Sequence, residues 1–274
     1  KKYNKIKLQP TIDATPALRA AVAEMKSRDE DSSTAFYKRF RGGFCVITGA
    51  NSSAGLQMIS ARTVIFEEIS EYPADAGGRG DPVEQAESRQ KAWLKRRIKR
   101  SKISTPNIVG ACRVSEAYET SDKRRLYVPC PQCGTYQVLI WPRLRWRADT
   151  PPYGAHYVCG AHGCIVEAAK RGFMVARGVW LKTYTDYGAD AAGQKLPCGD
   201  DDPPPPENIA EGDMPQWQAR RGHGSPARGL EPGFAIWQAY SPFVSWDDTV
   251  GEYLGAKDAP GQLKVFWQQG LGRR

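Results

Sequence analysis

The sequence predicts an α/β fold with a mostly parallel sheet and an inserted four-cysteine zinc ribbon. Three observations carry this prediction. Short apolar segments alternate with helical stretches in the first 126 residues, a pattern typical of parallel sheets covered by helices. Two pairs of closely spaced cysteines follow. The 274 residues, 41% of them hydrophobic and eight of them tryptophan, are enough for a substantial core.

The first part of the chain is expected to contain two helices and three strands. Residues 16–40 begin as an amphipathic helix, with Leu18, Val22 and Met25 at helical spacing. Three further segments are typical of buried strands: FCVITGA at residues 44–50, TVIFEE at residues 63–68, and the segment opened by KISTP at residues 102–106.

A second helix is predicted over residues 83–102, and its second half is strongly basic. A solvated helix face and a DNA-facing surface explain this charge equally well. The net charge of +9 for the whole chain favours an anionic partner, most commonly nucleic acid. The candidate DNA-binding residues are Lys95, Arg96, Arg97, Lys99 and Arg100.

The composition changes after residue 126. Residues 127–166 are rich in Cys, Gly, Trp and Pro, and no helical period persists there. Residues 185–232 are dominated by Gly, Asp and Pro, so we expect a poorly ordered excursion, because little apolar surface offsets the entropy of ordering. Order is expected to return with GFAIWQAYSPFVSW at residues 233–246, followed by helices over residues 246–257 and 260–269.

Four cysteines form the strongest chemical signal in the chain. Cys130 and Cys133 are spaced CxxC, and Cys159 and Cys164 are spaced CxxxxC. Two such turns present four thiolates tetrahedrally to Zn²⁺, in a closed site that is structural rather than catalytic. His162 lies at CxxH spacing from Cys159 and is the alternative fourth ligand, while four free thiols is the competing interpretation. The remaining cysteines stand alone and are expected to be ordinary thiols: Cys45, Cys112 and Cys198.

Two adjacent acids follow the apolar segment TVIF. Glu67 and Glu68 at this place are typical of a Walker B strand, in which the first acid holds Mg²⁺ and the second orients the water that attacks the γ-phosphate. The alternative is a chance occurrence, because apolar strands followed by two acids are common. The first acid is usually Asp, and Glu67 is one methylene longer. No GxxxxGK[ST] phosphate loop occurs in the chain, since Lys26-Ser27 and Lys182-Thr183 lack the preceding glycines.

Seven segments, in their order along the chain, resemble the large terminase subunit of tailed phages, in the lambda-like gpA branch. These segments are GANSSAGLQMISARTVIFEEISEYP, GDPVEQAESR, STPN, YETSDKRRLYVPCPQCG, HYVCGAHGC, GFAIWQAYSPFVSW and LKVFWQQGLG. The resemblance covers nearly the whole chain except the Pro/Asp-rich excursion. It implies a partial P-loop NTPase of the ASCE type, carrying the zinc ribbon as an insertion.

The resemblance also implies residue roles. Glu67 matches the Walker B metal acid, Glu68 the catalytic glutamate, and Ser104 and Thr105 the coupling motif that senses the phosphate. A helix cap or turn is the alternative for Ser-Thr-Pro. The GANSS residues Asn51, Ser52 and Ser53 follow the strand before Walker B and are assigned no chemistry.

Four parts of the chain follow from this resemblance. They are a partial ATPase core with Walker B and the coupling motif (residues 1–126), the zinc ribbon (127–168), the variable excursion (169–232), and a C-terminal helical part leading toward a nuclease domain (233–274). The phosphate loop is expected before residue 1 and the nuclease domain after residue 274. The chain is therefore expected to be an internal portion of a longer terminase or a truncated gene product. It is expected to hydrolyse little ATP alone, so whether this chain is itself an enzyme stays open.

The expected function is that of an ATP-driven motor that packages viral DNA into procapsids, with structural zinc, and with Mg²⁺ and ATP in the complete protein. The expected partners are double-stranded DNA, the small terminase subunit, the portal or procapsid, and further copies of the chain in a working ring. An intracellular protein is expected, because no apolar run approaches the roughly 20 residues of a membrane span and the N-terminus lacks a signal-peptide core. The phage resemblance implies the host bacterial cytoplasm as the location. The alternatives are a non-catalytic zinc-ribbon DNA-binding or assembly module, and an inert prophage remnant.

Overall fold

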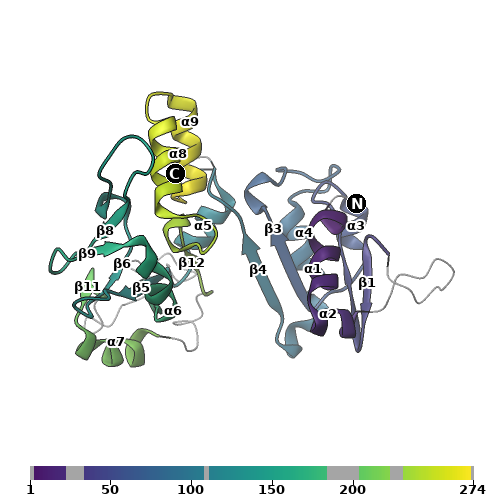
Figure 1. Ribbon diagram of the computed structural model, residues 1–274. Helices are drawn as coiled ribbons and strands as arrows, with labels where there is room; N and C mark the ends of the chain where they lie inside the picture. The colour runs from purple at the N-terminus through teal and green to yellow at the C-terminus, as the bar shows by residue number, and fades with distance from the viewer. Residues whose placement is uncertain (1–2, 23–33, 108–110, 184–203, 223–230, 273–274) are drawn as a thin grey trace. The chain divides into compact units, whose positions relative to one another are not determined.

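The computed structural model describes residues 3–22, 34–107, 111–183, 204–222 and 231–272 (Figure 1). Helices and strands both occur, in agreement with the α/β prediction. The chain divides into two compact units, one formed by Lys1–Phe66 and Glu71–Ser101, the other by Glu67–Ser70 and Lys102–Arg274. No helix in the described ranges is long and apolar enough to cross a membrane.

The first unit opens with short helices and a hairpin: η1 (Asn4–Leu8), α1 (Gln9–Ala14), α2 (Pro16–Ala21), β1 (Tyr37–Phe40) and β2 (Gly43–Val46). The two strands pair antiparallel through a two-residue turn, in which Gly42 adopts φ 83°, a backbone conformation that favours glycine. The helix expected at the start of residues 16–40 is present as α2, and residues 37–40 form β1. The prediction of a buried strand over residues 44–50 was wrong about burial, because Phe44 of β2 is 48% accessible. Met25 lies outside the described residues.

The segment that contains the acidic pair follows: α3 (Ser53–Gln57), β3 (Thr63–Glu67), η2 (Ile69–Glu71), α4 (Pro82–Ser88), η3 (Lys91–Arg96) and β4 (Lys99–Ile103). Strand β3 confirms TVIFE, although burial concentrates on Phe66, which is 2% exposed, while Ile65 is 63% exposed. Helix α4 begins where expected, because Asp81 caps it by accepting from the Val83 N–H at 2.7 Å.

The predicted basic helix over residues 83–102 is wrong in its second half. Helix α4 stops at Ser88, a 3-10 turn follows, and Arg97 at φ 51° ends that turn. The remaining basic residues form β4, which pairs with β3. The buried Gln90 amide supports this pairing by donating to the carbonyls of Arg62 and Lys99, each at 3.0 Å. Strand pairing in the tertiary structure thus overrides the helical pattern.

The second unit contains a five-stranded sheet with strand order β10-β5-β6-β11 and β12 added on β5 (Figure 1). Its strands and flanking helices are α5 (Arg113–Glu119), β5 (Arg124–Pro129), β6 (Tyr136–Val138), α6 (Arg171–Ala176), β10 (Val179–Lys182), β11 (Asn208–Ile209), α7 (Met214–Arg221) and β12 (Phe234–Ala235). A second, three-stranded sheet is antiparallel and consists of β7 (Leu144–Arg145), β8 (His156–Val158) and β9 (Ile165–Glu167).

The main core of this unit lies between the cysteine-rich segment and the C-terminal helices. Val128, Tyr157, Trp246 and Val250 are completely buried in it. The predicted C-terminal helices are confirmed as α8 (Trp246–Ala256), α9 (Pro260–Val265) and the π-helix η9 (Phe266–Gly270). The other 3-10 turns among the described residues are η4 (Trp141–Arg143), η5 (Ala168–Lys170), η6 (Glu211–Asp213) and η8 (Gln238–Tyr240).

Part of the predicted excursion contributes to a smaller core. Ile209 and Met214 are buried with Tyr127 and Leu181, and Trp217 packs against them. The prediction of poor order is therefore wrong for residues 204–222, because a few apolar side chains in this polar stretch pack against the sheet. The other parts of the predicted excursion, 185–203 and 223–230, and with them Cys198, lie outside the described ranges.

Parallel pairing is less widespread than predicted. Strand β12 pairs parallel with β5. Strands β3 and β4 run in the same direction, because Arg62, just before β3, bonds to Lys99 at the start of β4, and Glu68, just after β3, bonds to Ser104 just after β4. The hairpin β1–β2, the cysteine-bearing strands and the pairings of β10 and β11 are antiparallel. Short turns impose this direction on β1–β2, β5–β6 and β8–β9, since parallel pairing needs a long crossover.

Candidate functional site

The acidic pair lies at the end of β3, where the backbone changes direction. Glu67 is the last residue of the strand and is half-buried, while Glu68 follows it and is exposed. Glu68 adopts φ 54°, a left-handed conformation that is uncommon for a residue other than glycine. This conformation turns the chain out of the strand and into η2.

A hydrogen bond joins Glu68 to the end of the neighbouring strand. Ser104 follows the last residue of β4, and its Oγ donates to Glu68 Oε2 at 3.1 Å. The same Oγ accepts from the Ser70 N–H at 3.4 Å. Thr105 is exposed, and Ser104 is half-buried. Glu68, predicted from the acidic pair, and Ser104, predicted from the coupling motif, are thus in contact.

Cys112, which was expected to be an ordinary thiol, contacts Ser70, the residue whose N–H donates to Ser104. Its buried Sγ contacts Ser70 Oγ at 3.3 Å and accepts from the Asn107 N–H at 3.4 Å. Burial alone would raise the pKa of this thiol, but hydrogen bonds from Ser115, Ser70 and Asn107 outweigh it and lower the pKa to about 7.

The GANSS residues have structural partners. Ser52 caps α3 by accepting from the Gly55 N–H at 3.2 Å. Ser53 is buried and donates to Gln85 Oε1 of α4 at 2.9 Å. Asn51 is exposed at the preceding turn. These contacts join α3 to α4.

The four predicted cysteine ligands converge in the second unit. The sulfur atoms of Cys130, Cys133, Cys159 and Cys164 all lie within 4.8 Å of one another. Cys133 Sγ and Cys159 Sγ are 3.7 Å apart, which matches the edge of about 3.8 Å expected for a tetrahedron with Zn–S distances of about 2.3 Å. The donor set therefore fits a tetrahedral Zn²⁺.

The two cysteine turns have closely similar backbones. Cys130 and Cys159 each donate an N–H across their own turn, to Thr135 O and Cys164 O, both at 2.9 Å. Glycines with positive φ follow in each turn, Gly134 at 72° and Gly163 at 68°. The longer CxxxxC spacing is thus accommodated without loss of the cysteine geometry.

His162 is exposed and is not one of the four clustered donors. Burial would raise the pKa of the Cys133 thiol, but hydrogen bonds from Thr135 and, with a smaller effect, from His162 help to lower it. Burial raises the pKa of Cys130. The arrangement favours Cys164 over His162 as the fourth ligand.

The predicted DNA-binding residues do not share one environment. Lys95, Arg97 and Lys99 are exposed. Arg100 is occupied by the protein itself: its guanidinium lies 3.2 Å from Glu87 Oε2, and its Nε donates to Gln90 Oε1 at 2.6 Å. The side chain of Arg96 lies outside the described part of the chain.

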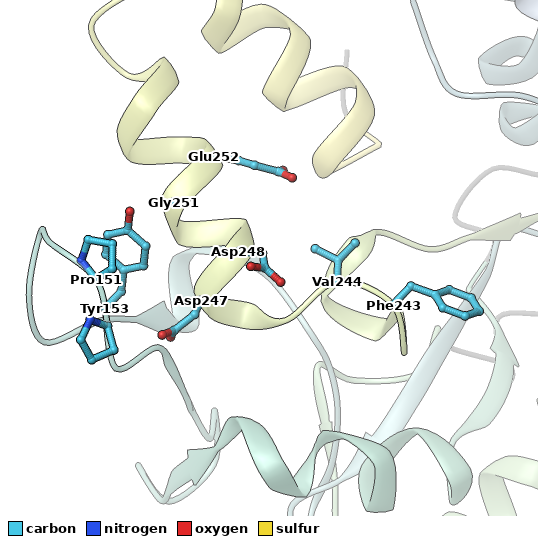
Figure 2. Close-up of a pocket in the computed structure, with 9 residues that line it drawn as sticks. Pro151, Tyr153, Phe243, Val244, Asp247, Asp248, Gly251 and Glu252 are labelled. Atoms are coloured by element: carbon cyan, nitrogen blue, oxygen red, sulfur yellow. The ribbon is translucent and has the colours of Figure 1, made fainter.

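An open groove of about 810 Å³ lies beside α8, and none of the predicted site residues lines it. In Figure 2, Pro151 and Tyr153 lie on one side of the helix, and Val244 and Phe243 on the other. The charged groups of the lining are carboxylates, from Asp247, Asp248 and Glu252. Such a lining repels phosphate, so the groove is unsuited to a nucleotide.

Comparison with known proteins places the chain among phage proteins. Residues 1–180 match the family model described as the ATPase domain of the phage terminase large subunit gpA. A "Terminase, large subunit" from Enterobacteria phage P21 is 27% identical over 289 residues, covering 99% of this chain and 40% of that protein. A protein with the same description from Escherichia phage lambda is 25% identical over 285 residues, covering 98% and 39%. The chain thus spans about two fifths of the length of these relatives, and no solved structure matches it.

Proposed function

Because the chain belongs to the family of the ATPase domain of the phage terminase large subunit gpA, we propose that it supplies the Walker B acids and the coupling motif of an ATP-driven DNA-packaging motor. The observation that carries the proposal is the 3.1 Å hydrogen bond from Ser104 to Glu68. A Walker B glutamate and a phosphate-sensing residue act together only if they lie at the same edge of the sheet. The ends of β3 and β4 meet this requirement.

Glu68 is proposed as the residue that orients the attacking water. Ser104 holds one carboxylate oxygen, and no described residue donates to the other, Oε1, which leaves that oxygen available to accept a hydrogen bond from water. Glu67, one position earlier, is proposed to hold Mg²⁺ directly or through water. The bound Mg²⁺ would neutralise charge on the ATP phosphates. Ser104 and Thr105 are proposed to relay the state of the site to the parts that grip DNA.

The four cysteines are proposed to hold a structural zinc. The zinc ribbon (residues 127–168) would then be stabilised by metal as well as by the core around Val128 and Tyr157. Because all four positions around the metal are taken by thiolates, no position remains for water or substrate. The zinc therefore has no proposed role in hydrolysis.

The proposed partners follow from the family. They are double-stranded DNA, the small terminase subunit, the portal or procapsid and further copies of the chain, all in the host cytoplasm. The exposed Lys95, Arg97 and Lys99 are proposed to contact DNA phosphates. The same basic residues, together with the zinc ribbon, would suffice for the second candidate function, a non-catalytic DNA-binding module.

Substitution of Glu68 separates these two functions. In a longer polypeptide that joins this chain to a phosphate-binding segment, we expect Glu68→Gln to lower kcat for ATP hydrolysis by about 100-fold or more, because the base that orients water is lost. The affinity for ATP should change little. Glu84→Gln, an equivalent change at an exposed glutamate of α4, is the control. Undiminished hydrolysis in Glu68→Gln would refute the Walker B proposal.

A further inference from the structure

A chain of hydrogen bonds connects the Glu68 turn to the C-terminal π-helix η9. Its members, all in the second unit, are Glu68, Ser104, Ser70, Asn107 and Gln268. We call this set the Asn107 relay. Ser70, Asn107 and Gln268 lie in segments that carry the family resemblance, but no role was predicted for any of them.

Ser70 is the first junction of the relay, and it uses its backbone as well as its side chain. Its N–H donates to Ser104 Oγ at 3.4 Å, its carbonyl accepts from Asn107 Nδ2 at 2.9 Å, and its Oγ contacts Cys112 Sγ at 3.3 Å. Ser70 lies two residues after Glu68. The position of the Glu68 backbone is therefore tied to the segment that follows β4 through three separate contacts.

Asn107 is the second junction. Its side chain donates to the Ser70 carbonyl, its N–H donates to Cys112 Sγ at 3.4 Å, and its carbonyl accepts from Gln268 Nε2. The donor and acceptor atoms of one residue thus join three segments that are far apart in the sequence. Ser70, Asn107 and Gln268 are each half-buried, so loss of one partner leaves a poorly solvated polar group unpaired.

The far end of the relay rests on a packed aromatic cluster. The π-helix η9 contributes the buried Phe266, whose ring centroid lies 5.2 Å from that of Trp141 and 5.6 Å from that of Tyr253. Leu271, directly after η9, is buried in the same cluster. Gln268 therefore extends from a rigid element, and the relay fixes the Glu68 turn against it.

We propose that Asn107 and Gln268 are positioning residues for ATP hydrolysis, which hold Glu68 and Ser104 in a fixed position relative to η9. This inference rests on the proposed function of Glu68. The strained backbone of Glu68 supports it, because a left-handed conformation at a glutamate persists only where the surrounding contacts fix it. Asn107 Nδ2 supplies one of those contacts by holding the Ser70 carbonyl.

The test measures ATP hydrolysis in the longer polypeptide that joins this chain to a phosphate-binding segment. Asn107→Asp keeps the shape and the backbone contacts of Asn107 but places an acceptor opposite the Ser70 carbonyl. Gln268→Ala removes the donor to Asn107, and Gln269→Ala, at the adjacent exposed position of η9, is its matched control. We expect Asn107→Asp and Gln268→Ala each to lower kcat about 5- to 20-fold, with KM for ATP changed less than about 2-fold.

A purely structural role would give a different result. It would lower the unfolding temperature and the fraction of active protein while leaving kcat per active site unchanged, and that outcome would overturn the proposal. Gln268→Ala and Gln269→Ala with equal kcat values would also overturn it. If Glu68→Gln abolishes hydrolysis while both relay variants retain the parent kcat, the relay fails and the Walker B proposal stands. If Glu68→Gln leaves ATP hydrolysis unchanged, the proposed function of Glu68 fails, and the relay proposal fails with it.

Discussion

Glu68 combines an unusual backbone with a specific side-chain contact. Its φ of 54° and its hydrogen bond from Ser104 are independent observations at one residue. A left-handed non-glycine residue costs about 1–3 kcal/mol and is concentrated at functional sites. Both observations are made at the residue that we propose as the catalytic glutamate.

The sequence predicted Glu68 and Ser104 but not the residues around them. Ser70 and Cys112 are separated by 42 positions, and Asn107 and Gln268 by 161. Serine, asparagine and a single cysteine are ordinary residues with no characteristic spacing. Only the fold, which carries the chain back on itself, shows that their polar atoms meet.

The thiol of Cys112 gives a prediction about pH. Its pKa is lowered from 9.0 to about 7 in the folded state, so the thiolate stabilises the fold fully above about pH 9, and this contribution is lost as the pH falls through 7. We compare the chain with Cys112→Ser, which has no titrating thiol there. The free energy of unfolding of the parent, minus that of the variant, should increase from pH 7 to pH 9 in urea titrations. A difference that is flat or decreases over this range would contradict the predicted pKa.

At the scale of elements, an ion pair attaches β12 to the edge of β5. Arg124 and Asp122 lie 2.8 Å apart, with side chains only 4% and 0% exposed. Asp122 Oδ1 also accepts from the Gly233 N–H at 3.1 Å, directly before β12. The Arg124 guanidinium lies over the Phe234 ring, 5.3 Å from its centroid. Two buried charges thus hold a strand of only two residues in place.

Removal of one member of this pair should be costly. We expect Asp122→Ala to lower the free energy of unfolding by about 3–5 kcal/mol, because Arg124 would be left buried and unpaired. The control is Glu167→Ala, which breaks the exposed pair with Arg147 and should cost less than about 1 kcal/mol. Urea unfolding measures both. Asp122→Asn provides the comparison if Asp122→Ala does not fold, and equal stabilities of Asp122→Asn and Glu167→Ala would contradict the prediction.

The elements also show where local pattern misleads. Residues 95–100 satisfy a helical pattern, yet β4 forms because β3 offers a partner strand and the Gln90 side chain donates to the carbonyl of Lys99, the first residue of β4. A contact between separate segments thus outweighs the helical preference of residues 95–100. Residues 37–40 form a strand because a glycine turn folds them onto β2.

For the whole molecule, the cysteine cluster belongs to the main core of its unit. Cys130 and Cys159 are 2% and 1% exposed and pack with Leu139, Leu144 and Tyr157. Two sheets and the C-terminal helices therefore share one interior with the proposed zinc. Without the metal, four sulfur atoms, two of them in buried residues, would remain close together with no cation between them.

Zinc removal should accordingly destabilise the whole second unit. We expect one Zn²⁺ per chain by elemental analysis, and Cys130→Ser should lower the metal content well below one and lower the unfolding temperature by several degrees. Cys45→Ser is the matched control, because Cys45 is an exposed thiol of β2. A parent protein with far less than one zinc per chain, prepared in zinc-supplemented medium, would refute the site.

Residue types at short spacing were enough to predict the acidic pair, the four cysteines and the C-terminal helices, and the order of the motifs along the chain was enough to predict the family. The strand directions, the exposure of Phe44 and Ile65, the use of Arg100 within the protein, and the contact between Glu68 and Ser104 became known only from the fold. Those features depend on which distant segments share an interior. Hydrogen bonding and burial act between neighbours in space, whereas a sequence pattern reports only neighbours along the chain.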